Sequence, residues 1–162
     1  MPRRRSERRS DAQPPVMIRR AALRDLDALL TLERQVFATD QISRRSMRRL
    51  LAVRSSVILV TERDGAIAGT AVILFRRGSA LARLYSIAVA PACSGQGLGA
   101  ALLAATEREA LARRCSAVRL EVHESNANAI ARYRKSGYRE FGRHAAYYED
   151  GGDALRFEKH LT

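Results

Sequence analysis

The sequence lacks the features that mark membrane, secreted and metal-binding proteins. No uninterrupted apolar stretch approaches the roughly 20 residues that span a bilayer, and the N-terminus has no apolar segment typical of a secretory signal. The two cysteines, Cys93 and Cys115, form neither a Cys-x-x-Cys pair nor part of a metal cluster, which suits a reducing compartment. We therefore expect a cytoplasmic protein without a metal site.

Repeats, heptads and low-complexity runs are also missing, and glycine and proline are few, with 10 and 4 residues. Collagen-like, coiled-coil and solenoid architectures are therefore excluded. The chain has 162 residues, of which 46% are hydrophobic, so it is long enough for one domain with a substantial core.

Lysine is almost absent, and the formal net charge of +12 is carried nearly entirely by arginine. Residues 1–16 hold five arginines and two acidic residues, and the remainder holds 24 basic and 15 acidic residues, so both parts are basic. Such a balance favours anionic partners, namely phosphorylated cofactors, nucleic acids or acidic protein segments. A GC-rich coding sequence would enrich arginine equally well.

The first 16 residues are polar and arginine-rich and include two adjacent prolines, which predicts a disordered arm. A second methionine, Met17, follows directly and predicts the start of the folded domain, residues 17–162. Two explanations of the arm stay open. It is either a weak tether to RNA or the ribosome, or the result of a start site upstream of the natural one.

Residues 17–162 alternate between strand and helix patterns. Strands are predicted at 16–21, 57–63, 66–75, 81–89, 117–122, 138–148 and 154–161, with an Asp64-Gly65 turn in the first hairpin and a Gly151-Gly152 turn in the last. Apolar residues at helical spacing predict two helices between 23 and 51, and further helices at 98–114 and 128–136. The result is an α+β domain of about seven strands and four helices, with antiparallel hairpins at both ends of the sheet and a parallel crossover in its middle.

Three glycines, Gly95, Gly97 and Gly99, stand between a predicted strand and a helix from about Leu98. A loop of this kind presents backbone N–H groups at the positive end of the helix dipole, and glycine lets a phosphate approach the backbone. We therefore expect a diphosphate site. A nucleoside-triphosphate loop is excluded because Gly-Lys-Ser/Thr is missing, whereas a dinucleotide fingerprint with Glu121 and a merely tight turn both stay open.

The segment around this loop, LYSIAVAPACSGQGLGAALL, resembles the acyl-CoA loop of the GNAT acetyltransferase superfamily, whose pattern is Q/R-x-x-G-x-G/A. The segment RLEVHESNANAIARYRKSGYREFGR resembles the strand, helix and strand that follow it. The resemblance spans residues 17–162 in element order and is sharpest over 81–148, although Ser94 stands where the pattern has Gln or Arg. It implies a GNAT-like mixed sheet and acetyl-CoA as co-substrate.

The same resemblance assigns roles in holding acetyl-CoA. It places the pyrophosphate on Gln96, Gly97, Gly99 and Ala100, and the pantetheine arm on the backbones of Ile87 and Val89. Asn126 is expected either to cap the following helix or to hydrogen-bond the pantetheine amides.

Two residues are candidates for the chemistry. Alternation in the strand 117–122 places Val118, Leu120 and Val122 on one face and Glu121 on the other, where it serves as a general base or forms an ion pair with an arginine such as Arg119. By resemblance, Tyr133 is the general acid that protonates the departing CoA thiolate; by itself it would be read as a buried core tyrosine.

Tyr147 and Tyr148 are candidates for binding the acceptor. They lie in RHAAYYEDGGDALRFEKHL, which is similar to the ribosomal-protein alanine N-acetyltransferase branch, where aromatic residues grip a peptide N-terminus. On a strand, one of the two would face inward and the other outward. The sequence thus predicts acetylation of a protein N-terminal amine by direct attack in a ternary complex. Acetylation of a small amine or a lysine, or CoA binding without catalysis, stays open.

Overall fold

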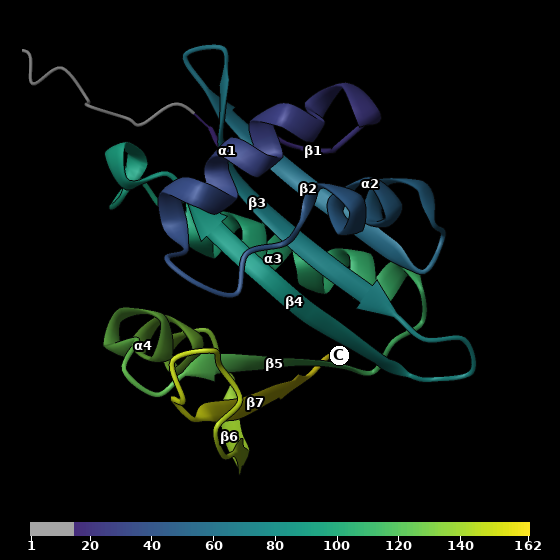
Figure 1. The fold of residues 1–162 in the computed structure, drawn as a ribbon. Coiled ribbons are helices and arrows are strands. Elements are labelled where there is room, and N and C mark those ends of the chain that lie inside the picture. Colours follow the sequence, from purple (N-terminus) through teal and green to yellow (C-terminus); the bar gives the residue numbers. More distant parts are fainter. Residues whose placement is uncertain (1–14) are drawn as a thin grey trace, which may run out of the picture.

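The computed structural model describes residues 15–162, which form one mixed sheet with helices on both faces (Figure 1). The predicted arm of residues 1–16, with its RNA contact, lies outside the described residues except for its last two, so the domain boundary stays a prediction. The helices are α1 (Leu26–Val36), α2 (Arg44–Ala52), α3 (Leu98–Ala112) and α4 (Ala127–Lys135), with 3-10 turns at Leu23–Asp25 and Pro91–Cys93.

The sheet has seven strands in the order β1-β2-β3-β4-β5-β7-β6, and only the central pair β4–β5 is parallel. The prediction of an α+β domain with about seven strands, four helices and a central parallel crossover is confirmed. The strands are β1 (Ile18–Arg20), β2 (Ser56–Arg63), β3 (Ala66–Phe75), β4 (Leu81–Val89), β5 (Ala117–His123), β6 (Arg139–His144) and β7 (Ala154–His160).

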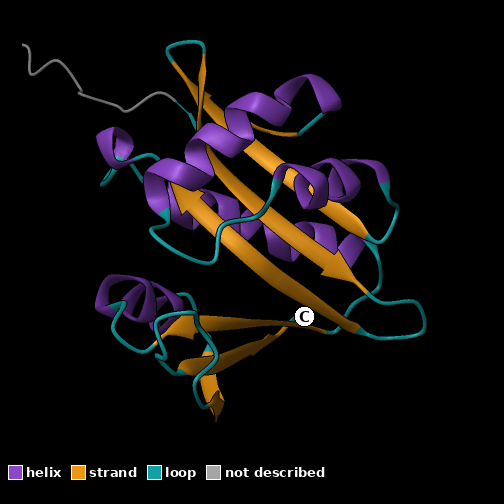
Figure 2. Cartoon of the chain, viewed as in Figure 1, coloured by secondary structure: helices purple, strands orange, loops and turns teal. Residues whose placement is uncertain are grey.

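The apolar residues of the central strands divide between two layers because successive side chains of a strand point to opposite faces. In β2, Val57 and Leu59 belong to the core cluster that includes residues of α3, whereas Ile58 and Val60 belong to the cluster that includes residues of α1 and α2. Figure 2 shows α1 and α2 on one face of the sheet and α3 on the other. An uninterrupted apolar run in β2 is thus buried on both sides, as expected for a covered strand.

The two hairpins differ in how well the sequence predicted them. Asp64 and Gly65 both have positive φ, 52° and 78°, which confirms the tight turn between β2 and β3. In the last hairpin β6 ends at His144, and residues 145–153 form a loop in which Asp153 accepts a hydrogen bond from the Ala146 N–H. The prediction that Tyr147 and Tyr148 lie on a strand is therefore wrong, since this side-chain contact ends the ladder before they are reached.

An irregularity in β4 creates the space for a site. Val72 of β3 pairs with Ser86 and Ile73 pairs with Leu84, so Tyr85 is an extra residue in β4 and forms a β-bulge. The pairing of β4 with β5 ends at the same place, at Leu84 and Leu120. Beyond it the two strands separate, as Figure 1 shows.

Candidate active site

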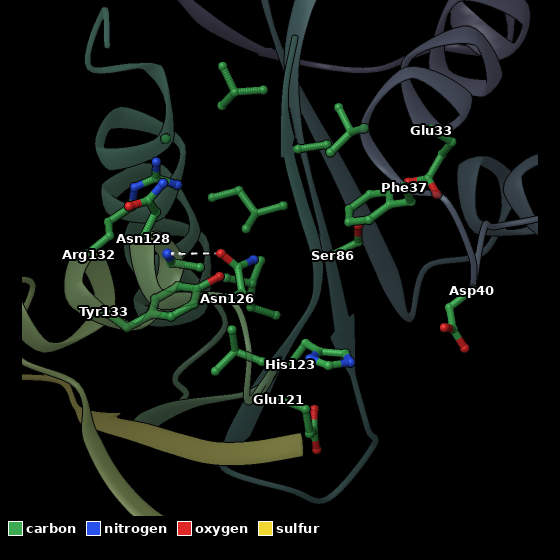
Figure 3. A pocket seen from close by; sticks show the side chains of 18 of the residues that line it. Glu33, Phe37, Asp40, Ser86, Glu121, His123, Asn126, Asn128, Arg132 and Tyr133 are labelled. Carbon is green, nitrogen blue, oxygen red and sulfur yellow. Dashed lines mark hydrogen bonds between the residues drawn. The ribbon is translucent and has the colours of Figure 1, made fainter. Parts of the chain in front are cut away.

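A cavity of about 1090 Å³ occupies the region where β4 and β5 diverge. Its walls come from the end of α1 and the segment 38–42, from β4 and the glycine loop, from α4, and from the loop 145–153. Figure 3 shows these walls facing one another, with Tyr133 and Asn126 on one side and Glu33, Phe37 and Ser86 on the other. Elements that are distant in the sequence therefore line one space.

The glycine loop has the geometry of an anion site. Gly95 and Gly97 have φ of 79° and 77°, and Gly97 is the N-cap of α3. Among the described residues, no backbone N–H from Gly95 to Ala100 donates to an acceptor in the protein. These free donors lie at the positive end of a helix dipole, so the residues present fit a pyrophosphate.

Gly99 lies against a charged side chain from another element. A Cβ at this position would lie 2.6 Å from Nη1 of Arg132, so a larger residue here would require this guanidinium to move. Gly97, Gly99, Ala100 and Arg132 all line the cavity, whereas Gln96 is in the same loop but is not among the lining residues. The sequence did not single out Arg132, because its place on α4 gives no sign that it reaches the start of α3.

Ile87 and Val89 line the cavity from the part of β4 that has left β5. On one side this segment pairs with β3, Ile87 opposite Ala71 and Val89 opposite Gly69, and on the other side it has no strand partner. An unpaired strand edge offers N–H and C=O groups to an extended ligand. The backbone groups that the predicted contacts to pantetheine require are therefore available at this edge.

Tyr133 projects from α4 with its ring in the core and lines the cavity (Figure 3). The side chain is buried at 4% exposure, and burial raises the pKa of its hydroxyl to about 12. No described residue forms a hydrogen bond with this hydroxyl. Asn126, at the start of α4, accepts a hydrogen bond from the Ala129 N–H at 3.2 Å, which confirms the capping alternative and leaves its amide nitrogen on the cavity side.

Glu121 lies on the half-exposed face of β5, as the alternation of apolar and polar residues predicted. The opposite face of β5 carries the buried residues Val118, Leu120 and Val122. Its carboxylate is 3.2 Å from Nε of Arg83 and 3.8 Å from Nε of Arg156. The expected partner Arg119 instead pairs with Glu158 at 2.8 Å. Residues that face each other across a ladder are closer than neighbours two apart on one strand, and Arg156 lies directly opposite Glu121.

The loop 145–153 brings two tyrosines to the cavity. The hydroxyl of Tyr147 accepts a hydrogen bond from Arg83 at 2.8 Å, so Arg83 links Tyr147 to Glu121. Tyr148 stacks on His123 with ring centroids 4.9 Å apart, and burial raises the pKa of its hydroxyl. His123 is itself fixed, because its Nε2 lies 2.8 Å from Asp150 and its Nδ1 lies 2.7 Å from the Ser125 hydroxyl.

Two acidic residues of the opposite wall were missed by the sequence reasoning. Glu33 of α1 is 1% exposed; its Oε2 accepts a hydrogen bond from the Ile42 N–H, and burial raises the pKa of its carboxyl group. Asp40 accepts a hydrogen bond from the Glu149 N–H at 3.3 Å and so joins two loops across the mouth of the cavity. A signal for Glu33 existed, since it stands at helical spacing from Leu26, Leu29 and Leu30, where an apolar residue is expected.

Residues 15–162 contain no cluster of His, Cys, Asp and Glu that could hold a metal ion. Within the same residues, no helix is both long and apolar enough to cross a membrane.

The divided sheet, the glycine loop at a helix start and the cavity between them fit a domain for an extended diphosphate ligand. A family model described as the acetyltransferase (GNAT) family matches residues 23–138. The chain belongs to this family and is an acetyltransferase, for which acetyl-CoA is the co-substrate.

Individual relatives agree with this assignment. An N-acetyltransferase of Methanocaldococcus jannaschii, described as uncharacterised, is 33% identical over 141 residues, which cover 86% of this chain and 88% of the relative. A Bacillus subtilis protein with the provisional name ribosomal-protein alanine N-acetyltransferase is 34% identical over 142 residues. This match covers 85% of this chain and 91% of the relative. The crystal structure of the ribosomal-protein alanine N-acetyltransferase from Escherichia coli has a TM-score of 0.82 at 28% identity and covers 91% of this chain and 95% of its own.

Proposed function

We propose that this enzyme acetylates the N-terminal α-amine of a protein, and that acetyl-CoA and the amine are bound together when the transfer occurs. The observation that carries the proposal is the placement of Tyr133 and Glu121 on different walls of one cavity, which the glycine loop also lines. An acid near the thioester sulfur and a base near the amine are what direct transfer requires.

Acetyl-CoA would be held mainly by backbone groups, with contributions from two side chains. The N–H groups of Gln96, Gly97, Gly99 and Ala100 would bind the pyrophosphate, and the Arg132 guanidinium beside Gly99 would add a positive charge. The free edge of β4 at Ile87 and Val89 would align the pantetheine arm, and the Asn126 amide would donate to it. Acetyl-CoA supplies an acetyl group on a good leaving group, and the protein supplies position and proton transfer.

Glu121 would accept the proton of the acceptor amine, directly or through a water molecule. The amine nitrogen then forms a bond to the acetyl carbon as the C–S bond breaks, and Tyr133 donates its proton to the sulfur. With a pKa of about 12 for Tyr133 against about 8.5 for a thiol, complete transfer is uphill by about 5 kcal/mol. Tyr133 therefore acts by sharing its proton while the bond breaks, and regains it from the ammonium that the attack creates.

Three observations support a protein N-terminus as the acceptor. The Bacillus subtilis and Escherichia coli relatives are named for an alanine of a ribosomal protein. Tyr147 and Tyr148 line the mouth of the cavity, where aromatic rings suit a short peptide segment. An α-amine also has a reference pKa near 8, against 10.4 for lysine, so a carboxylate base deprotonates it more readily.

The proposal is tested by incubating the protein with labelled acetyl-CoA and three kinds of acceptor. These are peptides with a free N-terminal alanine, the same peptides with a formylated N-terminus and an internal lysine, and small amines. We expect label only on the free-alanine peptides, located by mass spectrometry on the first residue. Label on lysine or on the small amines instead would identify another acceptor class and contradict the proposal.

The proposal also covers the division of the chain into domains and the location of the protein in the cell. Residues 17–162 would form the catalytic domain and residues 1–16 an arm with weak affinity for RNA or the ribosome. The proposed location is the cytoplasm, because two free cysteines suit a reducing compartment.

A further inference from the structure

Three segments that are distant in the sequence meet at the end of the sheet where β4 begins. They are the turn 53–55 after α2, the turn 76–80 between β3 and β4, and the segment 113–116 after α3. Hydrogen bonds join them: Phe75 N–H to Ser55 O at 2.7 Å, and Ser116 N–H to Ala80 O at 2.7 Å. Figure 1 shows this end of the sheet away from α4 and the loop that precedes α3.

The surface of this end, which we call the arginine end, is strongly basic. Six exposed arginine residues lie here, and none of them forms an ion pair with a described residue, although Arg113 donates a hydrogen bond to Arg54 O: Arg49, Arg54, Arg76, Arg77, Arg113 and Arg114. No aspartate or glutamate occurs in residues 44–61, 66–106 or 110–120, which supply all of these arginines. The positive charge at this end is therefore not neutralised by nearby carboxylates, unlike that of Arg19 or Arg143 elsewhere.

The composition of the arginine end favours a polyanion over a protein partner. Protein interfaces have an apolar, often aromatic centre, and among the described residues the one large apolar side chain exposed nearby is Leu111. Phe75 does not serve as such a centre, because the Arg113 guanidinium lies 4.2 Å above its ring. Guanidiniums bind phosphate oxygens in pairs and stack on bases, which an ammonium does not do.

We propose that the arginine end is a binding surface for RNA, contacted through its phosphate backbone. The choice of RNA over DNA rests on the proposed function. If the acceptor is a ribosomal protein, the enzyme encounters it close to ribosomal RNA. Dipole compensation at helix C-termini accounts for part of the cluster, namely Arg49 of α2 and Arg113 and Arg114 after α3. It does not account for Arg76 and Arg77, which lie in a turn between two strands.

The arginine end and the cavity are separate sites on the molecule. β4 runs from Leu81 beside the arginine end to Val89 at the glycine loop, and a strand of this length extends about 27 Å. RNA bound at one end of β4 therefore leaves acetyl-CoA free to bind at the other. The enzyme would be held near ribosomal RNA while its cavity stays open to a protein N-terminus.

The test measures binding of a fluorescently labelled 20-base-pair RNA duplex to the full chain by anisotropy, over a range of KCl concentrations. The test variant carries Arg54→Gln, Arg76→Gln and Arg77→Gln. The matched control replaces three other arginines, which are likewise exposed and form no ion pair with a described residue. Its changes are Arg24→Gln, Arg108→Gln and Arg139→Gln. Both variants lose the same charge and keep residues 1–16, so any contribution of the arm is equal in the two.

We expect the test variant to lose tenfold or more in affinity at about 0.1 M salt, and its slope of log K against log salt to fall by about 3 in magnitude. The control variant should bind like the wild type, and both should keep acetyl-CoA binding. Equal loss in the two variants, no binding by the wild type, tighter binding of a DNA duplex of the same sequence, or displacement by polyglutamate at lower concentration than by RNA would each overturn the proposal. Peptide acetylation is measured separately, so failure there does not affect this result.

Discussion

Replacing Tyr133 by phenylalanine is the sharpest test of the chemistry. The change removes one hydroxyl and keeps the ring, which packs against Phe157 with centroids 6.3 Å apart. Since no described residue forms a hydrogen bond with this hydroxyl, its removal breaks no hydrogen bond within residues 15–162. We therefore expect the melting temperature of the Tyr133→Phe variant to stay the same or to rise slightly.

The expected loss in kcat follows from the role of a general acid, which contributes about 10²- to 10⁴-fold, or roughly 3–5 kcal/mol of the barrier. Burial raises the pKa of Tyr133 from 10.0 to about 12, so its hydroxyl stays protonated at every lower pH. The fold-loss in kcat should therefore be constant from about pH 6 to pH 9, well below that pKa. The KM for acetyl-CoA should change little, because backbone groups hold the cofactor.

The assay follows release of the CoA thiol with a disulfide reagent, at saturating peptide and varied acetyl-CoA. Tyr138→Phe is the matched control: Tyr138 is buried at 3% exposure and packs edge-on against Tyr133 with centroids 5.8 Å apart, but it does not line the cavity. Its kcat should remain within about twofold of the wild type. Full turnover by Tyr133→Phe, or an equal loss in both variants, would refute the assignment of Tyr133 as the acid.

Three further predictions concern the base, the loop and the core. Glu121→Gln should lower kcat and flatten the rising limb of the pH–rate profile, whereas an unchanged limb would assign the base elsewhere. Gly97→Ala and Gly65→Ala should each lose about 1–2 kcal/mol of stability, because both positions have φ near 78° in open space, but only Gly97→Ala should raise the KM for acetyl-CoA. Thr70→Val should stabilise the fold by about 1 kcal/mol in urea titration, since its buried hydroxyl forms no hydrogen bond with a described residue. Thr106→Val should destabilise the fold, since the Thr106 hydroxyl donates a hydrogen bond to Leu102 O.

The sequence predicted what depends on local patterns. The alternation in β5, the turn at Asp64 and Gly65, and the glycine loop before α3 each follow from neighbours within a few residues, and the structure contains all of them. The contacts of Glu121 were not predictable in this way. Its partners Arg83 and Arg156 come from β4 and β7, and only the strand order places them beside β5.

The loop 145–153 was mispredicted for a related reason. The aromatic residues at Phe141, Tyr147 and Tyr148 favour a strand. Asp153, however, accepts a hydrogen bond from the Ala146 N–H and pairs with Arg143, and the chain leaves the ladder there. Contacts between side chain and backbone compete with strand pairing and are not visible as periodicity. Tyr147 and Tyr148 reach the cavity because of this loop rather than through the alternation of a strand.

The divergence of β4 and β5 explains why the cofactor contacts and the candidate base occur together. The bulge at Tyr85 ends the parallel pairing, so the residues that follow on β4, up to Val89, have an unpaired edge for an extended ligand. On β5 the first residue beyond the pairing is Glu121, which the same divergence leaves facing the cavity. If β4 continued in register with β5, the edge would be covered and Glu121 would have a strand directly beside it on both sides. One extra residue in one strand therefore coincides with the opening of the space that the proposed function assigns to both substrates.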